Sequence, residues 1–592
     1  MGVDVFFVIS GYLITNIIIS EMKEGRFSLL HFYERRVRRI FPALFFVILI
    51  SVPVSFIFML PEHLIKFGRS LISISVFISN FFFWSERGYF GVATDLKPFV
   101  HTWSLAVEEQ FYIIFPLFLL LIGKKYKLRN IVLLSVFLIS LSASWYLSRI
   151  HFETAFYLPF SRAWELLLGS SLALFRTGKT FNNRPYWQDF VAVTGLCLIA
   201  LAVFTFDSAT VFPGLAALVP TIGTAMVIYG CEGGKIIKKT LSMPVFVSFG
   251  LISYSLYLWH QPIFSLARHA GIFEEFLLFF IFISIVAAIF SYKFIEQPFR
   301  KKRIFSRKAI FISAASVSTI TMLIGFILVY KDGFVNRYAE EDRKILKQFS
   351  DITFYNQKIF DSILLQPYKD SEKKHILLVG DSYAKDFLNI VYEGGYNRFF
   401  EFSTKQINSE CGNIHVTTDF SSFIPESRQE RCRLLGRYDG AEMRRRASES
   451  DEIWLVNAWQ EWVLPFLPET VENLEREFGA KVRVFGIKGF GKISQKEILA
   501  IPPGSRTGFV QPVSRHVEKI NQAMLQILPV GNFNELLTVL CGGDYNECRI
   551  FTPEGLLISP DGGHLTQAGA KYLAQALAPM FMGFLPEAAT EN

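Results

Sequence analysis

Two short motifs in the C-terminal half of the chain carry residues that could together perform nucleophilic chemistry. The run HILLVGDSYAKDF (375–387) places Ser382 after a strand-like apolar stretch and before a helix-like stretch. Its hydroxyl would then lie at a helix N-terminus, whose free N–H groups can stabilise an oxyanion. Near the C-terminus, Asp561 precedes His564 by three residues in SPDGGHLTQAGAKYLAQAL. A serine nucleophile needs a base and the base needs an orienting acid, which His564 and Asp561 would supply.

Each motif alone also fits a plainer explanation, since Gly-Asp-Ser occurs in ordinary turns and Asp-x-x-His before a helix can be an N-cap. In this order, at the two ends of one domain, the motifs resemble the SGNH hydrolase family over about residues 375–580. The resemblance implies an α/β/α fold with a mainly parallel sheet, in which the serine, histidine and aspartate of these motifs are catalytic. It also implies an oxyanion hole completed by an Asn and a Gly, for which Asn457 in EIWLVNAWQEW and Gly412 in ECGN are candidates.

The composition of the whole chain is that of a membrane protein. Hydrophobic residues make up 51% and charged residues 19% of the 592 residues, and the mean hydropathy is +0.33, which excludes an ordinary soluble enzyme. The net charge of +8 comes from short basic clusters between apolar runs, which is typical of cytoplasmic loops rather than of a nucleic-acid-binding surface. We therefore expect contact with a lipid bilayer and no nucleic-acid partner.

Ten apolar stretches approach the ~20 residues that a spanning helix needs. They cover residues 3–20, 40–59, 110–122 extended back through HTWSLAVEEQ, 130–148, 159–176, 189–206, 211–230, 246–267, 273–295 and 309–330. The basic loops all fall on one side if the further run 69–84 does not cross fully, so we expect that run to be re-entrant or interfacial. The expected parts are a membrane domain (1–300), a linking transmembrane helix (301–331), a linker or small helical extension (332–374) and the α/β/α domain on the outer face (375–585).

Four cysteines lie in polar sequence after residue 400. They are Cys411, Cys432, Cys541 and Cys548, and the sequence leaves their pairing open. Cysteines gathered in one extramembrane domain are candidates for disulfides, which form on the oxidising side of a membrane. No Cys-x-x-Cys pair is present, so we expect no metal site.

Charged residues in the membrane half could also do chemistry. The run FYERRVRRIFPAL (32–44) gathers four arginines, which either mark the cytoplasmic side or bind an anionic donor such as the phosphates of a coenzyme. These are Arg35, Arg36, Arg38 and Arg39. In HTWSLAVEEQFYIIFP (101–116), Glu108 and Glu109 follow His101 near the start of a helix. They either complement the helix N-terminus or act at a site, because carboxylates next to a membrane are costly.

Two further motifs place polar residues in apolar segments. Arg162 and Glu165 in SRAWELLLGSSLAL are three residues apart on one helix and can pair with each other. His260 in ISYSLYLWHQPI lies at an expected outer helix end. There it is either a proton-transfer group or a member of an interfacial aromatic belt.

The ordered motifs resemble the membrane acyltransferase-3 family with a C-terminal SGNH domain, the O-antigen O-acetyltransferase type. The motifs are GVDVFFVISGYLIT, FYERRVRRIFPAL, HTWSLAVEEQFYIIFP, SRAWELLLGS, SYSLYLWHQP and IEQPFRKK. The resemblance implies that an acyl group, commonly acetyl from cytoplasmic acetyl-CoA, crosses the membrane to a hydroxyl of a free or lipid-linked envelope glycan such as lipopolysaccharide O-antigen. It implies acetyl-CoA as a donor substrate, no permanently bound cofactor, and a multi-pass protein of the bacterial inner membrane whose SGNH domain is periplasmic.

In the resembling family, the GVDVFFVISG segment is the second helix, and the first carries an Arg and a His needed for acyl transfer. We therefore expect either a helix preceding Met1 or an inactive truncated copy. Two other functions stay open from the residues alone. One is a membrane-tethered esterase that removes acyl groups, and the other is a non-enzymatic exporter of an envelope glycan.

Overall fold

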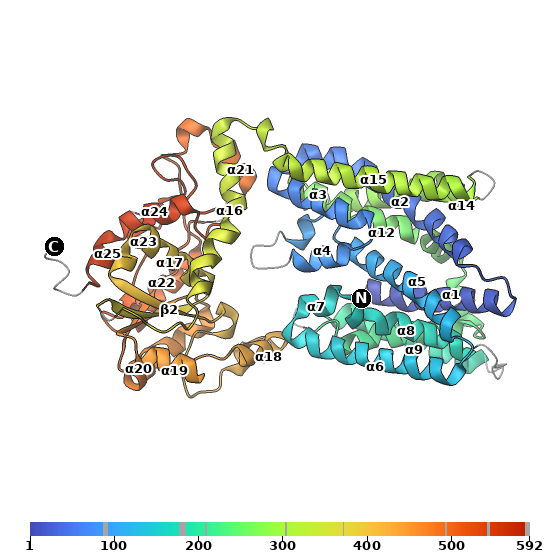
Figure 1. The fold of residues 1–592 in the computed structure, drawn as a ribbon, viewed down its shortest axis with the longest axis horizontal. Helices are drawn as coiled ribbons and strands as arrows, with labels where there is room; N and C mark the ends of the chain where they lie inside the picture. The colour runs from blue at the N-terminus through green and yellow to red at the C-terminus, as the bar shows by residue number, and fades with distance from the viewer. Residues whose placement is uncertain are drawn as a thin grey trace. The chain divides into compact units, whose positions relative to one another are not determined.

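The computed structural model describes residues 1–86, 93–176, 185–207, 210–301, 305–370, 372–491, 494–541 and 545–585. The chain forms two compact units, Met1–Phe334 and Val335–Asn592. The first unit is helical, and the second contains a parallel β-sheet between helices (Figure 1). This agrees with the expected membrane domain followed by an α/β/α domain.

Long helices make up most of the first unit. They are α1 (Gly2–Lys23), α2 (Leu29–Phe58), α3 (Pro61–Ser75), α5 (Thr102–Ile122), α6 (Tyr126–Ile150), α8 (Pro159–Arg176), α9 (Pro185–Thr205), α10 (Leu218–Cys231), α12 (Pro244–Ala270), α13 (Leu277–Phe290) and α15 (Arg307–Tyr330). Shorter helices connect them: α4 (Ser79–Ser85), α7 (Phe152–Tyr157), α11 (Ile236–Leu241) and α14 (Gln297–Arg300), the last joined to α13 by a π-helical stretch, Ser291–Glu296. Helices suit a bilayer because they satisfy their backbone hydrogen bonds internally.

All ten expected spans appear as helices, and seven segments of the described chain are long and apolar enough to cross a membrane. They are Gly2–Lys23, Leu29–Phe58, Thr102–Ile122, Tyr126–Ile150, Pro185–Thr205, Leu277–Arg300 and Arg307–Tyr330. The other three expected spans correspond to α8, α10 and α12. Of these, α8 carries Arg162 and Glu165, α10 has 14 residues, and α12 mixes His260 and Gln261 with its apolar residues.

Two boundaries differ from the sequence expectation. Helix α2 begins at Leu29 rather than at residue 40, because Glu and Arg are good helix formers that hydropathy does not register. The run 69–84 is not one helix, since α3 ends at Ser75 and α4 begins at Ser79, with Phe77 between them at φ +55°. A non-glycine residue in that conformation interrupts helical hydrogen bonding.

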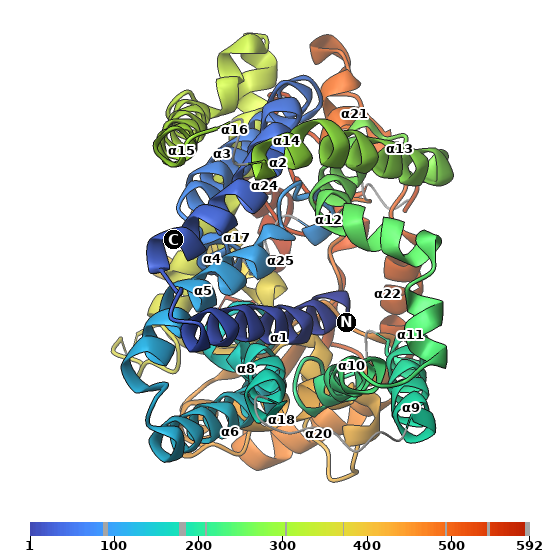
Figure 2. The ribbon, with the colours of Figure 1, turned by 90° about the vertical axis from the view of Figure 1, so that its right-hand side faces the viewer.

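Close approach of small residues joins helices in the first unit. Figure 2 shows α1 beside α8, and α15 packs against α3 and α2. Gly68 of α3 and Gly325 of α15 face each other's backbone: a Cβ on Gly68 would lie 2.7 Å from the Gly325 carbonyl oxygen, and one on Gly325 2.5 Å from that of Gly68. Small residues at such crossings let helix backbones touch within a membrane. The expected linking helix is thus packed into the first unit.

The second unit is built on a five-stranded parallel sheet. Its order is β2-β1-β3-β4-β6, formed by β1 (Lys374–Gly380), β2 (Phe400–Gln406), β3 (Glu452–Val456), β4 (Lys481–Phe485) and β6 (Phe533–Asn534). A separate antiparallel pair joins β5 (Val510–Gln511) to β7 (Cys548–Arg549). The strands expected from ILLVG, EIWLVN and KVRVFGI are confirmed as β1, β3 and β4.

Alternate residues of the central strands enter two separate cores, one on each face of the sheet. On β1, Ile376 and Leu378 enter one core and Leu377 and Val379 the other, as the two-residue period of a strand requires. The first core includes residues of α16 (Glu340–Ser362), α17 (Ser382–Glu393), α24 (Gln567–Ala576) and α25 (Ala578–Met582). The second includes residues of α18 (Glu426–Leu435), α19 (Ala441–Ser448), α20 (Leu467–Phe478) and α22 (Arg515–Ile527). The segment expected as linker or helical extension therefore contains a helix, α16, that packs on this domain.

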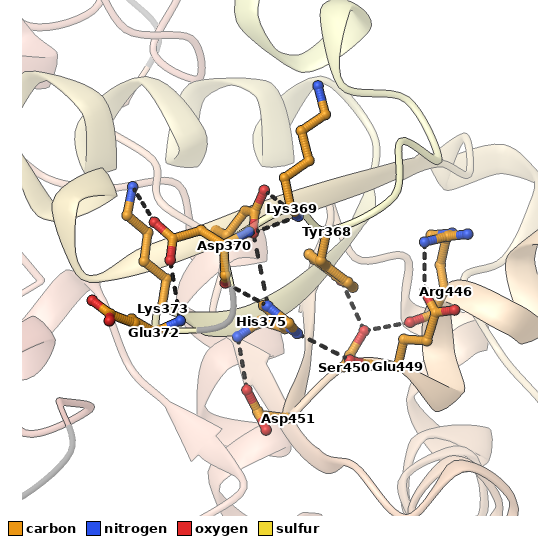
Figure 3. Close-up of polar contacts among 11 residues, drawn as sticks. Tyr368, Lys369, Asp370, Glu372, Lys373, His375, Arg446, Glu449, Ser450 and Asp451 are labelled. Carbon is orange, nitrogen blue, oxygen red and sulfur yellow. Dashed lines mark hydrogen bonds and ion pairs between the residues drawn. The ribbon is translucent and has the colours of Figure 1, made fainter.

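Polar contacts anchor the segment between α16 and β1 at the amino end of the sheet (Figure 3). The Tyr368 and His375 rings stack with centroids 4.3 Å apart, and the Tyr368 hydroxyl lies 2.8 Å from the Ser450 hydroxyl. The His375 N–H donates to the Asp451 carboxylate at 2.7 Å. The carboxyl ends of the same strands, at the opposite edge, carry the site below. Two disulfides, Cys411–Cys432 and Cys541–Cys548, pair all four expected cysteines.

The Gly68–Gly325 contact predicts a stability effect. Gly325→Val would force α15 away from α3 and should cost about 1–3 kcal/mol, as overpacking typically does. Thermal unfolding of the full chain in detergent measures it as a lower Tm. Gly250→Val is the matched control, because a Cβ on Gly250 of α12 would meet nothing within 4 Å. Equal Tm values for the two variants would contradict the close packing of α3 and α15.

Candidate active site

The β1–α17 turn presents Ser382. Strand β1 ends at Gly380, and Asp381 caps α17, so that Ser382 is the first residue of that helix. The Asp381 carboxylate accepts the N–H groups of Tyr383 at 2.9 Å and Ala458 at 3.0 Å, which ties the turn to the end of β3. Burial raises the pKa of Asp381 to about 6, although both N–H groups oppose that rise. The sequence prediction of strand, turn and helix is confirmed here.

The structure brings Ser382, His564 and Asp561 together from opposite ends of the domain. The His564 Nε2 atom lies 2.9 Å from the Ser382 hydroxyl oxygen, and its Nδ1 atom lies 2.6 Å from the Asp561 carboxylate. His564 is 2% exposed, whereas Ser382 is partly exposed. This is the geometry of a nucleophile, a general base and an orienting acid.

The Asp561 carboxylate is held in place by its own loop. Its second oxygen accepts the N–H groups of Gly563 at 2.8 Å and His564 at 2.7 Å. Burial by itself would raise the pKa of Asp561, but the hydrogen bonds from the His564 side chain and from these N–H groups hold it well below its ordinary value. Asp561 therefore stays ionised and orients the imidazole throughout the neutral and mildly acidic range.

Two N–H groups near Ser382 are candidates for binding an oxyanion. The Ser382 N–H belongs to the first turn of α17, where N–H groups have no partner within the helix. Asn457 directly follows β3, next to the end of β1, because Gly380 pairs with Val456 in parallel register. The Asn457 amide nitrogen donates one hydrogen to the Ile407 carbonyl at 3.2 Å, which leaves its second hydrogen for a ligand.

A buried network that the sequence did not reveal fixes the orientation of Asn457. The Asn413 amide donates to the Asn457 side-chain oxygen at 2.5 Å and to the Val379 carbonyl at 3.3 Å. The Tyr438 hydroxyl in turn donates to the Asn413 oxygen at 2.5 Å. Because the Asn457 oxygen is an acceptor here, its amide nitrogen must face the other way. No spacing signal links these positions, so only the fold could show the network.

Gly412 lies beside this network with φ +72°, against the Trp462 ring. Its N–H donates to the Ser409 carbonyl at 3.3 Å. An N–H engaged in this way must release its partner before it can bind an oxyanion. The oxyanion role of Gly412 stays a prediction.

In the membrane unit, the arginine run lies inside α2 and its members differ in their contacts. Arg38 is buried and donates to Glu34 at 3.0 Å and to the carbonyls of Phe299 at 3.2 Å and Phe305 at 2.7 Å. Glu34 also accepts from Arg307 at 2.7 Å. Arg38 therefore connects the start of α2 to the segment before α15, which is a structural contact.

The other three arginines are less tightly engaged. Arg35 pairs with Glu21 at 2.8 Å. The Arg36 guanidinium lies 5.0 Å above the Tyr112 ring, and Arg39 is exposed with no ion pair or hydrogen bond to the part of the chain that the structure describes. Arg36 and Arg39 are thus the members of the run most available to an anionic ligand.

Glu108 and Glu109 also differ in their hydrogen-bond partners. Glu108 is buried on α5 and accepts hydrogen bonds from the Ser10 and Tyr112 hydroxyls. Since Arg36 lies over Tyr112, the arginine run and the HTWSLAVEEQF motif form one cluster. One oxygen of Glu109 is buried without a hydrogen-bond partner among the described residues.

His260 lies within α12, ten residues before its end at Ala270, rather than at a helix terminus. Its ring centroid is 5.3 Å from that of His101, and its Nδ1 atom lies 3.2 Å from the Leu256 carbonyl. Helix α12 is longer than its apolar stretch because Ser265, Arg268 and neighbouring polar residues continue it. His260 borders a cavity of about 570 Å³ in the membrane unit, which Ser104, Tyr254 and Tyr257 also line.

Arg162 pairs with Glu165 at 2.9 Å, as their spacing predicts, and also with Asp4 of α1 at 2.9 Å. All three side chains are at most 1% exposed. The contact with Asp4 crosses between helices, and no spacing pattern indicates it.

The chain is similar to several known proteins. A family model described as an acyltransferase domain, Acyl_transf_3, matches residues 1–296. The chain is 30% identical to the O-acetyltransferase OatA of Staphylococcus aureus strain MRSA252 over 419 residues, covering 66% of this chain and 69% of that protein. A putative O-acetyltransferase of the same strain is also 30% identical, over 65% and 69% of the two chains. Among solved structures, the periplasmic domain of a lipopolysaccharide acetyltransferase from Salmonella ser. Paratyphi A matches with 14% identity and a TM-score of 0.26, over 36% of this chain and 85% of that one.

The geometry predicts how Ser382 reacts with a fluorophosphonate probe. Asp561→Asn should lower the labelling rate of Ser382 by about 10²–10⁴, because an amide presents His564 in the wrong tautomer. Folding lowers the pKa of Asp561, so the ionised carboxylate stabilises the folded domain. This stabilisation is fully present above the pKa of the unfolded chain, about 3.9, and is lost as the pH falls through the lower pKa of the folded state.

Asp451→Asn is the matched control, since its carboxylate also accepts an N–H but lies at the amino end of the sheet. Labelling by gel fluorescence and peptide mass spectrometry should be unchanged for this control. Undiminished labelling of the Asp561→Asn variant would contradict the orienting role of Asp561.

Proposed function

The chain belongs to the acyltransferase-3 family, and from this membership we propose that it transfers acetyl from cytoplasmic acetyl-CoA to a hydroxyl of an envelope glycan such as lipopolysaccharide O-antigen. It is an O-acyltransferase and a multi-pass membrane protein. The observation that carries the proposal is the 2.9 Å contact between the Ser382 hydroxyl and His564 in a chain that also holds the acyltransferase domain.

The proposed transfer has two halves at Ser382. In the first, the Ser382 oxygen attacks the acyl carbonyl while His564 takes its proton, and the oxyanion is held by the Ser382 N–H and the Asn457 amide. The tetrahedral intermediate collapses, the leaving group departs with the proton from His564, and an acyl-serine remains. In the second half, a sugar hydroxyl gives its proton to His564 and attacks the acyl-serine, which restores Ser382 and leaves an ester on the glycan.

The proposed donor site lies on the arginine run of α2. Acetyl-CoA carries phosphates, and guanidinium groups bind phosphate oxygens through charge-assisted hydrogen bonds. Arg36 and Arg39 are assigned this role because Arg38 already satisfies Glu34 and two carbonyls. The neighbouring Glu108 cluster would then position groups on the path of the acyl group into the membrane.

The proposed location is the bacterial inner membrane with the C-terminal domain in the periplasm. Both disulfides of that domain support an oxidising compartment, where such bonds persist. Placing the serine site there separates it from the donor in the cytoplasm. The membrane unit must therefore carry the acyl group across.

Replacing the nucleophile tests the serine role. Ser382→Ala should abolish acetylation of the glycan in cells while the amount of protein in the membrane stays unchanged, because no other step of the proposal can transfer the acyl group. The O-acetyl content of the purified envelope glycan measures this. Ser362→Ala is the matched control, because Ser362 is an exposed residue of α16 whose hydroxyl donates to the Ile359 carbonyl of the same helix. Full acetylation by Ser382→Ala would remove the serine from the mechanism. Removal of acyl groups from the glycan by the wild-type protein without acetyl-CoA would favour an esterase.

Replacing the arginines separates donor binding from structure. Arg39→Gln should raise the KM for acetyl-CoA about 10-fold or more in inverted membrane vesicles, since a charge-assisted hydrogen bond is lost. Arg38→Gln should instead lower the Tm, because it leaves the buried Glu34 without one partner. An unchanged KM for both Arg39→Gln and Arg36→Gln would place the donor elsewhere.

A further inference from the structure

A buried lysine lies behind the serine site. Lys488 belongs to the loop that follows β4 and is 1% exposed. The loop is fixed by α22, since Asn521 accepts the Ile487 N–H at 2.8 Å and donates to the Ile487 carbonyl at 2.9 Å. These two hydrogen bonds fix the backbone of the loop and therefore the position of the Lys488 Cα atom.

The Lys488 ammonium joins two elements that carry the site. It donates to the Asp386 carboxylate at 2.6 Å and to the Gly563 carbonyl at 2.5 Å. Asp386 lies four residues after Ser382, one turn further along α17, and is fully buried. Gly563 immediately precedes His564. One cation therefore ties the helix of the nucleophile to the loop of the base.

Other contacts reinforce the same connection. The Phe490 N–H donates to the Gly562 carbonyl at 2.9 Å, so two successive carbonyls of the His564 loop are bound by the loop after β4. The Lys488 ammonium also lies 4.0 Å from the centre of the Tyr383 ring. A Cβ on Gly563 would come within 2.7 Å of the Tyr383 hydroxyl, so this loop lies close against the Tyr383 side chain.

We infer that Lys488 and Asp386 are positioning residues that set the distance between the Ser382 hydroxyl and His564. This inference rests on the proposed serine chemistry and goes beyond it, because neither residue touches an acyl group. A buried ion pair contributes little net stability compared with apolar residues of similar size. Here the ion pair acts by fixing geometry, because three elements meet at one ammonium group and are held at set distances from one another.

The charges near His564 make this positioning role measurable in the pH dependence of kcat/KM. Asp561 faces the imidazole from its own loop, Asp381 and Asp386 from the start of α17, and Lys488 from the loop after β4. Burial raises the pKa of Asp386, and Lys488 and His564 oppose that rise. Asp386→Asn removes a negative charge that lies near the base. The acid limb of kcat/KM should then move to lower pH.

The experiment measures Ser382-dependent hydrolysis of 4-nitrophenyl acetate by the full chain in detergent. Lys488→Met should lower kcat/KM by up to about 100-fold through kcat, because small displacements of a base are costly. Asp386→Asn should move the acid limb to lower pH. The double variant Lys488→Met with Asp386→Leu removes both charges, so it should keep a Tm near that of the wild type and still be slow.

Arg483→Met is the matched control. Arg483 also forms a buried ion pair, with Glu452 at 2.7 Å, but it lies within strand β4, before the loop that carries Lys488. It should lower the Tm and leave kcat/KM and the acid limb of the folded enzyme unchanged.

Different outcomes would overturn the inference and the proposed function. Hydrolysis by the Ser382→Ala variant at the rate of the wild type would refute the serine chemistry itself. The positioning role would be overturned if the double variant kept full kcat/KM for Ser382-dependent hydrolysis. It would also be overturned if the variants lost activity only in proportion to the protein that is unfolded, with no shift of the acid limb.

Discussion

The parallel pairing of β1 with β3 is the constraint on which the serine site depends. Gly380 pairs with Val456, so the residues that follow each strand, Asp381 and Asn457, emerge side by side at the carboxyl edge of the sheet. A side chain at Gly380 would collide with the Val456 carbonyl, so glycine permits this register. The cap from Asp381 to Ala458 then fixes the turn against β3. Backbone pairing therefore places the candidate nucleophile beside the candidate oxyanion donor Asn457, and the C-terminal loop supplies the candidate base.

Sequence patterns could predict the parts of this site that are local. A strand, a tight turn and a helix start identify Ser382, and a three-residue spacing identifies Asp561 with His564. The supporting contacts could not be predicted in this way. Asn413 reaches Asn457 across 44 positions and Lys488 reaches Asp386 across 102, and neither pair leaves a spacing signal. Such contacts follow from the order of the strands, which the sequence indicates only as alternating elements.

The membrane unit shows the same division between local and long-range information. Hydropathy located the helices but placed the start of α2 at residue 40 instead of Leu29, because charged helix formers extend it. The expected Arg162–Glu165 pair is local, whereas its partner Asp4 lies on another helix. Buried charges in such a unit must be paired or hydrogen-bonded, since an isolated ion in an apolar surrounding is costly. Each arginine of the α2 run could therefore be sorted by its partners only once the helices were placed.

The proposed function depends on an acyl group passing through Ser382. The most direct measurement is rapid-quench mass spectrometry of the full chain in membrane vesicles given isotopically labelled acetyl-CoA without acceptor glycan. We expect a labelled acetyl ester on the peptide containing Ser382. It should disappear when acceptor is added, as the label enters the glycan. Labelled glycan that forms while the Ser382 peptide stays unmodified at every time point would contradict it.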